Sequence, residues 1–192
     1  MGGPDTLKIN YGDIEMREKR TSIDFSKHEL TIKETNEVLV HWLKKPNTIC
    51  NNVKFINIKG DVLVVVGDYG NWVFCREFHP SKDGYVCDRY WVEKLKNSST
   101  QNPYTFDPEE AKSEIDDLLK EHEWSHEEIE FLNSLRQASD LTEGEFVAAC
   151  YNYPPGFDTE MMPTGKVYDH SLLVVFDAFE EICKRLSEVS HV

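Results

Sequence analysis

The feature that most restricts the fold of this 192-residue chain is the segment 62–74, in which two apolar runs flank the tetrapeptide Gly-Asp-Tyr-Gly. Glycine adopts positive φ at little cost, so this pattern predicts two strands joined by a tight turn. The first run, Val-Leu-Val-Val-Val, has no polar face. Such a strand is covered on both faces, or on one face with a partner on the other. The segment therefore predicts a hairpin at the centre of a sheet.

Short strand-like segments surround this hairpin. Residues 23–25 and 28–32 alternate between apolar and polar side chains, and residues 53–58 do so in part. The β-branched content of residues 38–43 favours a strand over the competing helix through residues 37–44. Because the connections are short, we expect an antiparallel meander of consecutive hairpins.

The second half of the chain carries clear signals for helix starts. A capping side chain precedes an acidic first turn at residues 107–110, 125–128 and 142–145. A last helix is predicted after Asp169, because apolar side chains recur at helical spacing over residues 172–186. This apolar stripe is the predicted cover of the sheet.

These elements predict an α+β fold, in which an antiparallel β-meander in the N-terminal half is covered by helices from an acidic helical C-terminal half. Residues 1–22 mix charges with few apolar side chains and are predicted to be a loosely ordered arm. Residues 23–106 form the sheet half, with one short helix over residues 87–95. A polar linker at residues 97–103 leads to the acidic helical half, residues 107–192, and the whole is expected to be one compact domain.

The net charge of −14 is distributed unevenly. Residues 1–106 carry 15 Lys/Arg and 14 Asp/Glu, whereas residues 107–192 carry 6 and 21, a net of −15. Such a field repels nucleic-acid backbones, so direct nucleic-acid binding is disfavoured and a protein with a basic surface is the expected partner. Helix capping and a solvated surface are the plainer uses of acidic side chains. The candidate partner-binding residues are Glu114, Asp117, Glu121, Glu127, Glu130 and Glu143.

Composition also limits the cellular setting. The apolar runs are far shorter than the ~20 residues that a membrane-spanning helix needs, and the first residues lack a signal-peptide core. The five cysteines show no Cys-x-x-Cys spacing, which indicates reduced thiols rather than a disulfide framework. We expect a cytoplasmic protein without a membrane segment or a cofactor.

Four sequence motifs, taken in order, resemble a broad group of bacteriophage and prophage proteins of unknown function. They are Leu-Thr-Ile at residues 30–32, His-Trp-Leu-Lys-Lys-Pro at residues 41–46, Gly-Asp-Tyr-Gly-Asn-Trp-Val-Phe at residues 67–74, and Tyr-Trp-Val-Glu-Lys-Leu at residues 90–95. The resemblance covers residues 28–106, departs from the pattern at residues 47–52, and extends to the acidic half only in general character. It implies a phage accessory protein of the host bacterial cytoplasm and supplies no catalytic residues.

Few residues of the sequence are candidates for catalysis or metal binding. Asp68 could act as a base or hold a cation, but aspartate is among the commonest turn residues, and a structural role in the turn is preferred. Cys75, His79 and Cys87 are weak zinc candidates, because structural zinc normally takes four ligands at tighter spacing. No catalytic residue is assigned.

The aromatic residues of the sheet half allow a second use. They could form a stacking platform for bases, with basic residues nearby, although core packing is the commoner use of aromatic side chains at strand and helix spacing. The residues concerned are Trp42, Trp72, Tyr90 and Trp91.

The leading hypothesis is a non-enzymatic phage accessory protein that binds a host cytoplasmic protein. In its concrete form, an acidic surface that mimics phosphates inhibits a nucleic-acid-handling or defence factor. The alternatives are a small metal-dependent hydrolase that uses Asp68, His79 and Cys87, and a module that binds single-stranded nucleic acid on the aromatic sheet half. The sequence does not specify the oligomeric state.

Overall fold

The computed structural model describes residues 19–80, 86–97, 102–140 and 142–189. The predicted α+β class is confirmed, with an antiparallel six-stranded sheet, a two-stranded ribbon and five α-helices among the described residues. In chain order the elements are β1 Glu29–Glu34, β2 Val38–Lys44, β3 Asn52–Ile58, β4 Leu63–Gly67, β5 Gly70–Phe74, α1 Asp88–Lys94, β6 Leu95–Asn97, β7 Tyr104–Phe106, α2 Pro108–Glu121, α3 His126–Ala138, α4 Glu143–Cys150, the 3-10 helix η1 Thr159–Met161, β8 Lys166–Tyr168 and α5 His170–Val189.

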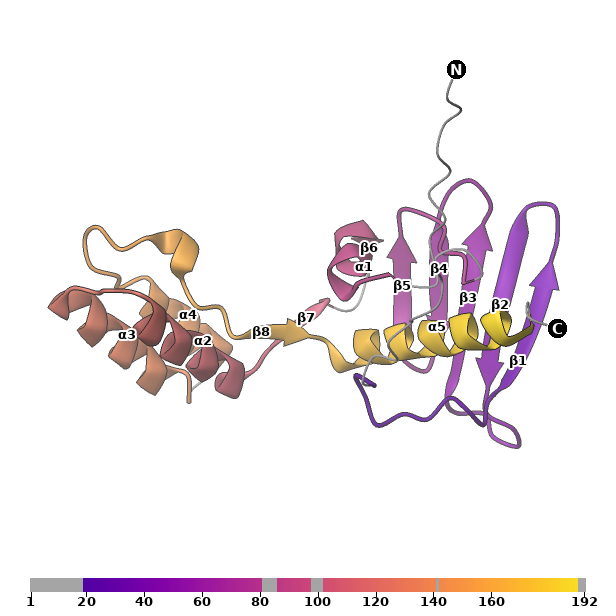
Figure 1. Ribbon diagram of the computed structural model, residues 1–192, viewed down its shortest axis with the longest axis horizontal. Helices are drawn as coiled ribbons and strands as arrows, with labels where there is room; N and C mark the ends of the chain where they lie inside the picture. The colour runs from indigo at the N-terminus through magenta and orange to yellow at the C-terminus, as the bar shows by residue number, and fades with distance from the viewer. Residues whose placement is uncertain (1–18, 81–85, 98–101, 141, 190–192) are drawn as a thin grey trace, which may run out of the picture.

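The elements form two bodies joined by the β7–β8 ribbon (Figure 1). We call the first the sheet body, which comprises β1–β6, α1 and α5. The second, the helical module, comprises residues 107–165 with α2, α3, α4 and η1. Each body has its own cluster of buried apolar side chains. Helix α5, at the end of the described chain, packs on the sheet, and the helical module precedes it in the sequence.

The predicted hairpin is β4 and β5, inside a sheet whose strands pair in sequence order from β1 to β6. The segment for which a helix competed is strand β2. A Cβ on Gly67, whose φ is +154°, would lie 2.1 Å from the backbone oxygen of Asn52, so only glycine fits this close approach. The Asp68 carboxylate accepts hydrogen bonds from the backbone and side-chain nitrogens of Asn52, at 2.8 and 2.7 Å. Asp68 therefore ties the turn to the start of β3, in agreement with the structural interpretation.

Helix α5 is the predicted cover of the sheet and crosses one of its faces (Figure 1). Its apolar stripe packs with the inward side chains of the strands and with Trp91 of α1. The rings of Trp91 and Phe78 stack with centroids 3.8 Å apart, and the Phe179 ring of α5 lies 4.9 Å from Trp91. This aromatic cluster fixes α1 and α5 on the same side of the sheet.

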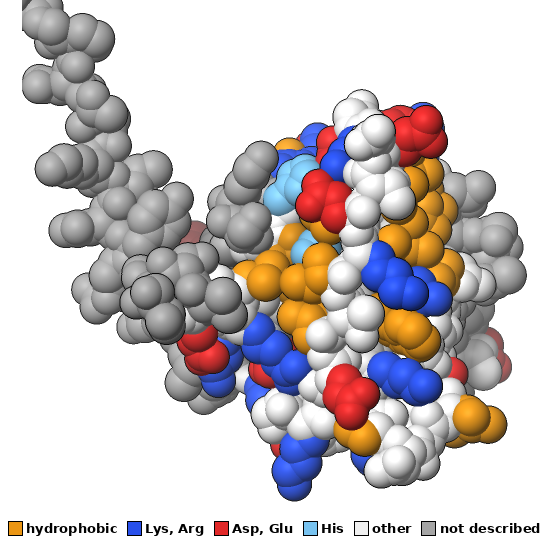
Figure 2. Space-filling model, turned by 90° about the vertical axis from the view of Figure 1, so that its right-hand side faces the viewer, with side chains coloured by type: hydrophobic (Ala, Val, Ile, Leu, Met, Phe, Trp, Pro, Cys, Tyr) orange, Lys and Arg blue, Asp and Glu red, His pale blue; other side chains and the backbone are white. Residues whose placement is uncertain are grey.

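The opposite face of the sheet is half-buried, because strand alternation places every second side chain there. We call it the open sheet face. It is mostly aliphatic, with one tryptophan and one lysine among the aliphatic side chains. It consists of Val38, Val40, Trp42, Lys54, Ile56, Ile58, Val64, Val66 and Val73. The view from the β1 side shows hydrophobic side chains interspersed with Lys and Arg (Figure 2).

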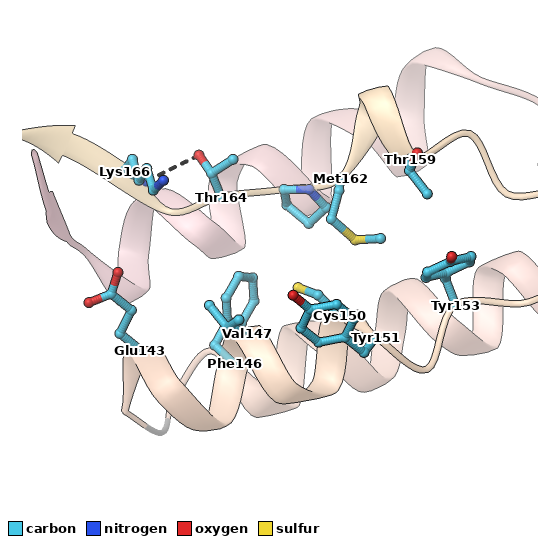
Figure 3. A pocket seen from close by; sticks show the side chains of 11 residues that line it. Glu143, Phe146, Val147, Cys150, Tyr151, Tyr153, Thr159, Met162, Thr164 and Lys166 are labelled. Carbon is cyan, nitrogen blue, oxygen red and sulfur yellow. Dashed lines mark hydrogen bonds between the residues drawn. The ribbon is translucent and has the colours of Figure 1, made fainter.

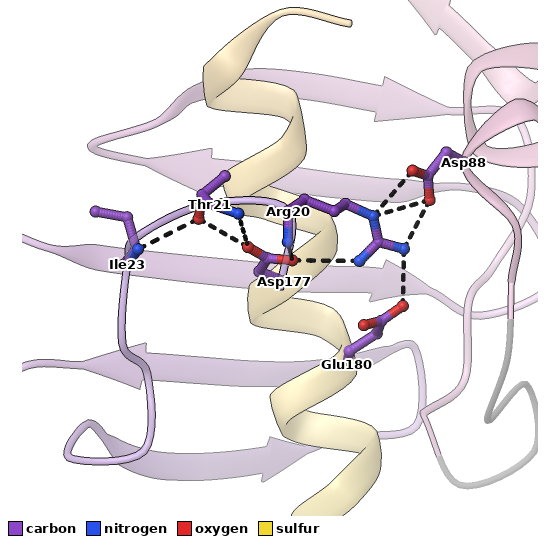
Figure 4. A network of polar contacts seen from close by, with 6 residues as sticks. All are labelled: Arg20, Thr21, Ile23, Asp88, Asp177 and Glu180. Carbon is purple, nitrogen blue, oxygen red and sulfur yellow. Dashed lines mark hydrogen bonds and ion pairs between the residues drawn. The ribbon is translucent and has the colours of Figure 1, made fainter. Parts of the chain in front are cut away.

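The last residues of the predicted N-terminal arm are held against α5 (Figure 4). Residues 1–18 of that arm lie outside the described residues. Thr21 donates from its backbone nitrogen and its hydroxyl to Asp177, at 2.9 and 2.7 Å. Arg20 pairs with Asp88, Asp177 and Glu180, at 2.7, 3.2 and 2.8 Å. Although burial opposes its charge, these hydrogen bonds raise the pKa of Arg20.

Among the described residues, no helix combines the length and apolar character needed to cross a membrane.

Candidate functional site

The helical module carries nearly all of the net charge. Residues 107–165 contain 16 Asp/Glu and 3 Lys/Arg, a net of −13 out of −14. The three predicted helix starts are confirmed, with Asp107 capping α2 and complete capping boxes at Ser125 for α3 and Thr142 for α4. Acidic residues at these starts therefore have a local structural role.

The structure divides the six predicted partner-binding residues into two groups. Glu114, Asp117 and Glu130 have partners within the module. The Glu114 carboxylate accepts hydrogen bonds from the backbone nitrogens of Thr164 and Gly165, at 2.6 and 2.8 Å. Glu114 therefore holds the segment before β8 against α2.

Asp117 and Glu130 are paired with neighbouring exposed side chains on their own helices. Asp117 lies 3.2 Å from Lys120, and Glu130 lies 3.4 Å from His126. Exposed pairs of this kind contribute little to stability, so these carboxylates stay available to a partner.

Glu121, Glu127 and Glu143 are exposed and have no partner among the described residues. They lie on α2, α3 and α4 respectively. Three further carboxylates of the module share this property, namely Glu110, Glu123 and Glu160. Capping and ion pairs thus account for only part of the acidic charge.

A groove runs between α4 and the segment of residues 159–166, with a volume of about 400 Å³ (Figure 3). Phe146, Val147 and Cys150 line it from α4, and Met162 lines it from the opposite wall. Its remaining lining residues are Glu143, Tyr151, Tyr153, Thr159, Pro163, Thr164 and Lys166.

Three of these lining residues are large apolar or aromatic side chains exposed to solvent. The exposed fractions are 44% for Val147, 78% for Tyr151 and 44% for Tyr153. Burial raises the pKa of the Cys150 thiol, which keeps it protonated and unsuited to act as a nucleophile. The groove is therefore shaped for contact with apolar groups rather than for catalysis.

The weak zinc candidates are not brought together. Cys75 is exposed at the end of β5, and His79 pairs with Glu77 at 2.9 Å. Among the described residues, no three His, Cys, Asp or Glu side chains are placed to hold a metal ion. With Asp68 bound to Asn52, the hydrolase hypothesis gains no geometric support.

The four aromatic residues of the predicted stacking platform also separate. Trp72 and Trp91 are fully buried in the core of the sheet body, and Tyr90 accepts a hydrogen bond from Arg76 at 3.0 Å. Trp42 alone of the four lies on the open sheet face, with the ammonium groups of Lys54 and Lys44 at 4.5 and 5.4 Å from its ring centre.

Sequence reasoning missed the groove because its two walls come from segments separated by a proline-rich turn. The available signal was the presence of three large apolar or aromatic side chains within seven residues around the end of α4, namely Val147, Tyr151 and Tyr153.

Searches of protein-family models, curated proteins and solved structures each found no match for this chain, so its function is inferred from its own residues.

Proposed function

We propose that the protein acts by binding a partner with a basic surface through its helical module. The observation that carries this proposal is the confinement of −13 of the −14 net charge to a module that has its own core and extends from the sheet body on the β7–β8 ribbon (Figure 1). A concentrated field of one sign accelerates encounter with an oppositely charged surface and selects against partners of the same sign.

The arrangement of carboxylates on α2 supports mimicry of a phosphate backbone. Glu110, Asp117 and Glu121 recur at intervals of seven and four residues, which places them along one side of the helix. Glu114 lies on the same side, but its carboxylate is bound to the backbone of the segment before β8. Like charges at this spacing destabilise an isolated helix, so the row has a cost in stability. A binding role for the row would offset that cost.

In its finer form, the proposal is that a bacteriophage encodes this protein and that it inhibits a nucleic-acid-handling or defence protein of the host cytoplasm. The resemblance of residues 28–106 to phage proteins supports the setting, and the acidic module supports the class of target. A groove that normally holds nucleic acid is lined by Lys and Arg, and carboxylates complement such a groove.

The test compares two double variants with equal changes in charge. Glu121→Gln with Glu127→Gln removes two unpaired carboxylates of the module, and Glu29→Gln with Glu37→Gln removes two exposed carboxylates of the sheet body. Each immobilised protein is used to capture partners from bacterial lysate, and the recovered protein is then purified and titrated.

We expect a basic partner whose affinity falls several-fold in the module variant, falls with added salt, and competes with duplex DNA. The sheet-body variant is expected to match the wild type. A partner that is not basic, or binding that is insensitive to salt, would overturn the proposal.

A second candidate function is binding of single-stranded nucleic acid on the open sheet face. The observation that favours it is Trp42, which lies there with Lys44 and Lys54 within cation–π distance. Fluorescence anisotropy of a labelled oligothymidylate at about 50 mM salt tests it, because this contact is strongest at low ionic strength. Binding that disappears in Trp42→Leu supports this function, and the absence of binding removes it.

A further inference from the structure

We propose that the groove between α4 and residues 159–166 receives the apolar side chains of an amphipathic, Lys/Arg-bearing helix of the partner. This inference rests on the proposed function and adds where the partner is anchored. Charge brings the two surfaces together, and the groove supplies apolar contact that salt does not screen.

The composition of the groove favours an apolar ligand. Phe146 is 1% exposed, whereas Val147 on the same helix is 44% exposed and Tyr151 at its C-cap is 78% exposed. Met162 on the opposite wall is a flexible, polarisable side chain suited to contact with varied apolar shapes. A groove of about 400 Å³ has room for large side chains such as leucine or phenylalanine.

The backbone of the wall opposite α4 disfavours recognition of an extended strand. A strand added to an edge needs free backbone N–H groups, and here all but one of them are already used or missing. Thr164 and Gly165 donate to Glu114, and Pro163 has no N–H. Of the five other N–H groups of this wall, four also donate within the protein, those of Glu160, Met161, Met162 and Lys166. Recognition therefore depends on side chains, as when a helix lies in a groove.

The charge around the groove defines the polar face of the ligand. Glu143 lines one end, where Lys166 is the single basic lining residue, and Tyr153 and Thr159 lie toward the other end (Figure 3). The carboxylate of Glu160, on the η1 wall, has no partner among the described residues. Within a module of net −13, these surroundings complement Lys and Arg beside the apolar side chains of a helix.

The length of α4 sets the length of the contact. Eight residues extend over about 12 Å, so the groove accommodates about two turns of a partner helix. Apolar side chains four residues apart lie on one face over that length, which predicts a pair of anchors at i and i+4.

The test uses the full chain and two synthetic peptides. The first probe is a fluorescein-labelled Leu-Lys peptide of about 18 residues with leucines at helical spacing, long enough to form a helix. The second carries Ser in place of every Leu, with the same lysines. The groove variants are Val147→Asn and, at a site too exposed to disturb folding, Tyr151→Ser. The matched control is Ile129→Asn, because Ile129 is 39% exposed on α3 of the same module and does not line the groove.

We expect the Leu-Lys peptide to bind more tightly than the Ser-Lys peptide. Its affinity is expected to fall about tenfold in Val147→Asn, to fall in Tyr151→Ser, and to change less than about twofold in Ile129→Asn. Circular dichroism verifies that each variant is folded.

Two outcomes separate the failure of this inference from the failure of the proposed function. If both peptides bind equally and only Glu121→Gln with Glu127→Gln weakens them, the groove is not the anchor, while the binding of a basic partner stands. If neither peptide binds at low salt, the electrostatic attraction is absent and both proposals are overturned.

Discussion

The sheet body and the helical module differ in how they use charge. The helical module has a net charge of −13, and the remainder of the chain, with 18 Lys/Arg and 19 Asp/Glu, has a net of −1. Besides exposed pairs, the sheet body has an ionic network inside, where the side chains of Arg20 and Asp177 are 9% and 5% exposed. The module places its carboxylates outside, and several have no partner among the described residues. Charged side chains therefore stabilise the fold of the sheet body, whereas in the helical module several of them remain available for binding.

The cores differ in a parallel way. The sheet body is built on large buried rings, whereas the module has a smaller core and leaves apolar side chains exposed beside its groove. Because the two buried clusters share no residue, damage to one core is expected to spare the other. The predictions below test that independence and begin with the largest effect.

The largest effect is expected for Trp91→Ala in the sheet body. Trp91 is 1% exposed and contacts Phe74, Phe78 and Phe179, so its removal leaves a cavity that costs about 4 kcal/mol. Hydrogen exchange measured by mass spectrometry should show lost amide protection in the sheet and in α5.

Amides of α2 and α3 serve as the internal control and should keep their protection. An equal loss in both bodies would mean that they unfold as one cooperative unit, and the contrast between them would fail.

Asp177→Ala is expected to lower the free energy of unfolding by about 3 kcal/mol. The substitution removes one of the carboxylates that bind the guanidinium of Arg20 and leaves the two donors of Thr21 without their acceptor. Urea unfolding measures this loss. Glu180→Ala is the matched control, since Glu180 binds the same guanidinium but its side chain is 33% exposed. Equal losses of stability in the two variants would show that burial does not determine how much each carboxylate contributes to the free energy of unfolding.

Local features of the fold were largely predictable from the sequence. The turn at Gly67, the caps at Ser125 and Thr142, and the apolar stripe of α5 are set by neighbouring residues, and the structure confirms each. The doubly apolar run of β4 predicted a strand covered on both faces, or on one face with a partner on the other, and its second apolar side lies on the open sheet face.

Features that depend on distant segments were not predictable. Arg20 and Asp177 are separated by 157 residues, and nothing near Arg20 indicates its partner. Likewise, the prediction of acidic binding residues counted charges but could not show that Glu114 is used to hold Thr164 and Gly165. The groove required α4 and residues 159–166 to lie on either side of it, and no local pattern sets that placement.

Acid is expected to affect the two bodies over different pH ranges. Burial lowers the pKa of His28 and His41 in the sheet body below the ordinary value of 6.5. The unfolded chain then binds protons that the folded chain does not, so stability is complete above pH 6.5 and falls as the pH decreases.

In the module, hydrogen bonds lower the pKa of Glu128 and Glu145 below 4.5. The contribution of these two carboxylates to the stability of the module is complete above pH 4.5 and is lost only below that pH. Hydrogen exchange at pH 7 and about pH 5.5, corrected for intrinsic rates, should therefore reveal weaker protection in the sheet body alone. Uniform weakening, or none, would contradict this assignment.

The smallest effect concerns two equivalent caps in the module. Thr142→Ala and Ser125→Ala each remove a capping box, and each is expected to cost about 1 kcal/mol in the stability of the module. Thr142 begins α4, which forms one wall of the groove, whereas Ser125 begins α3, which contributes no lining residue. Fraying of α4 displaces Glu143 and Val147, so only Thr142→Ala should also weaken the Leu-Lys peptide, by a few-fold in a fluorescence titration. If both variants weaken it equally, peptide affinity follows the general stability of the module rather than the shape of the groove.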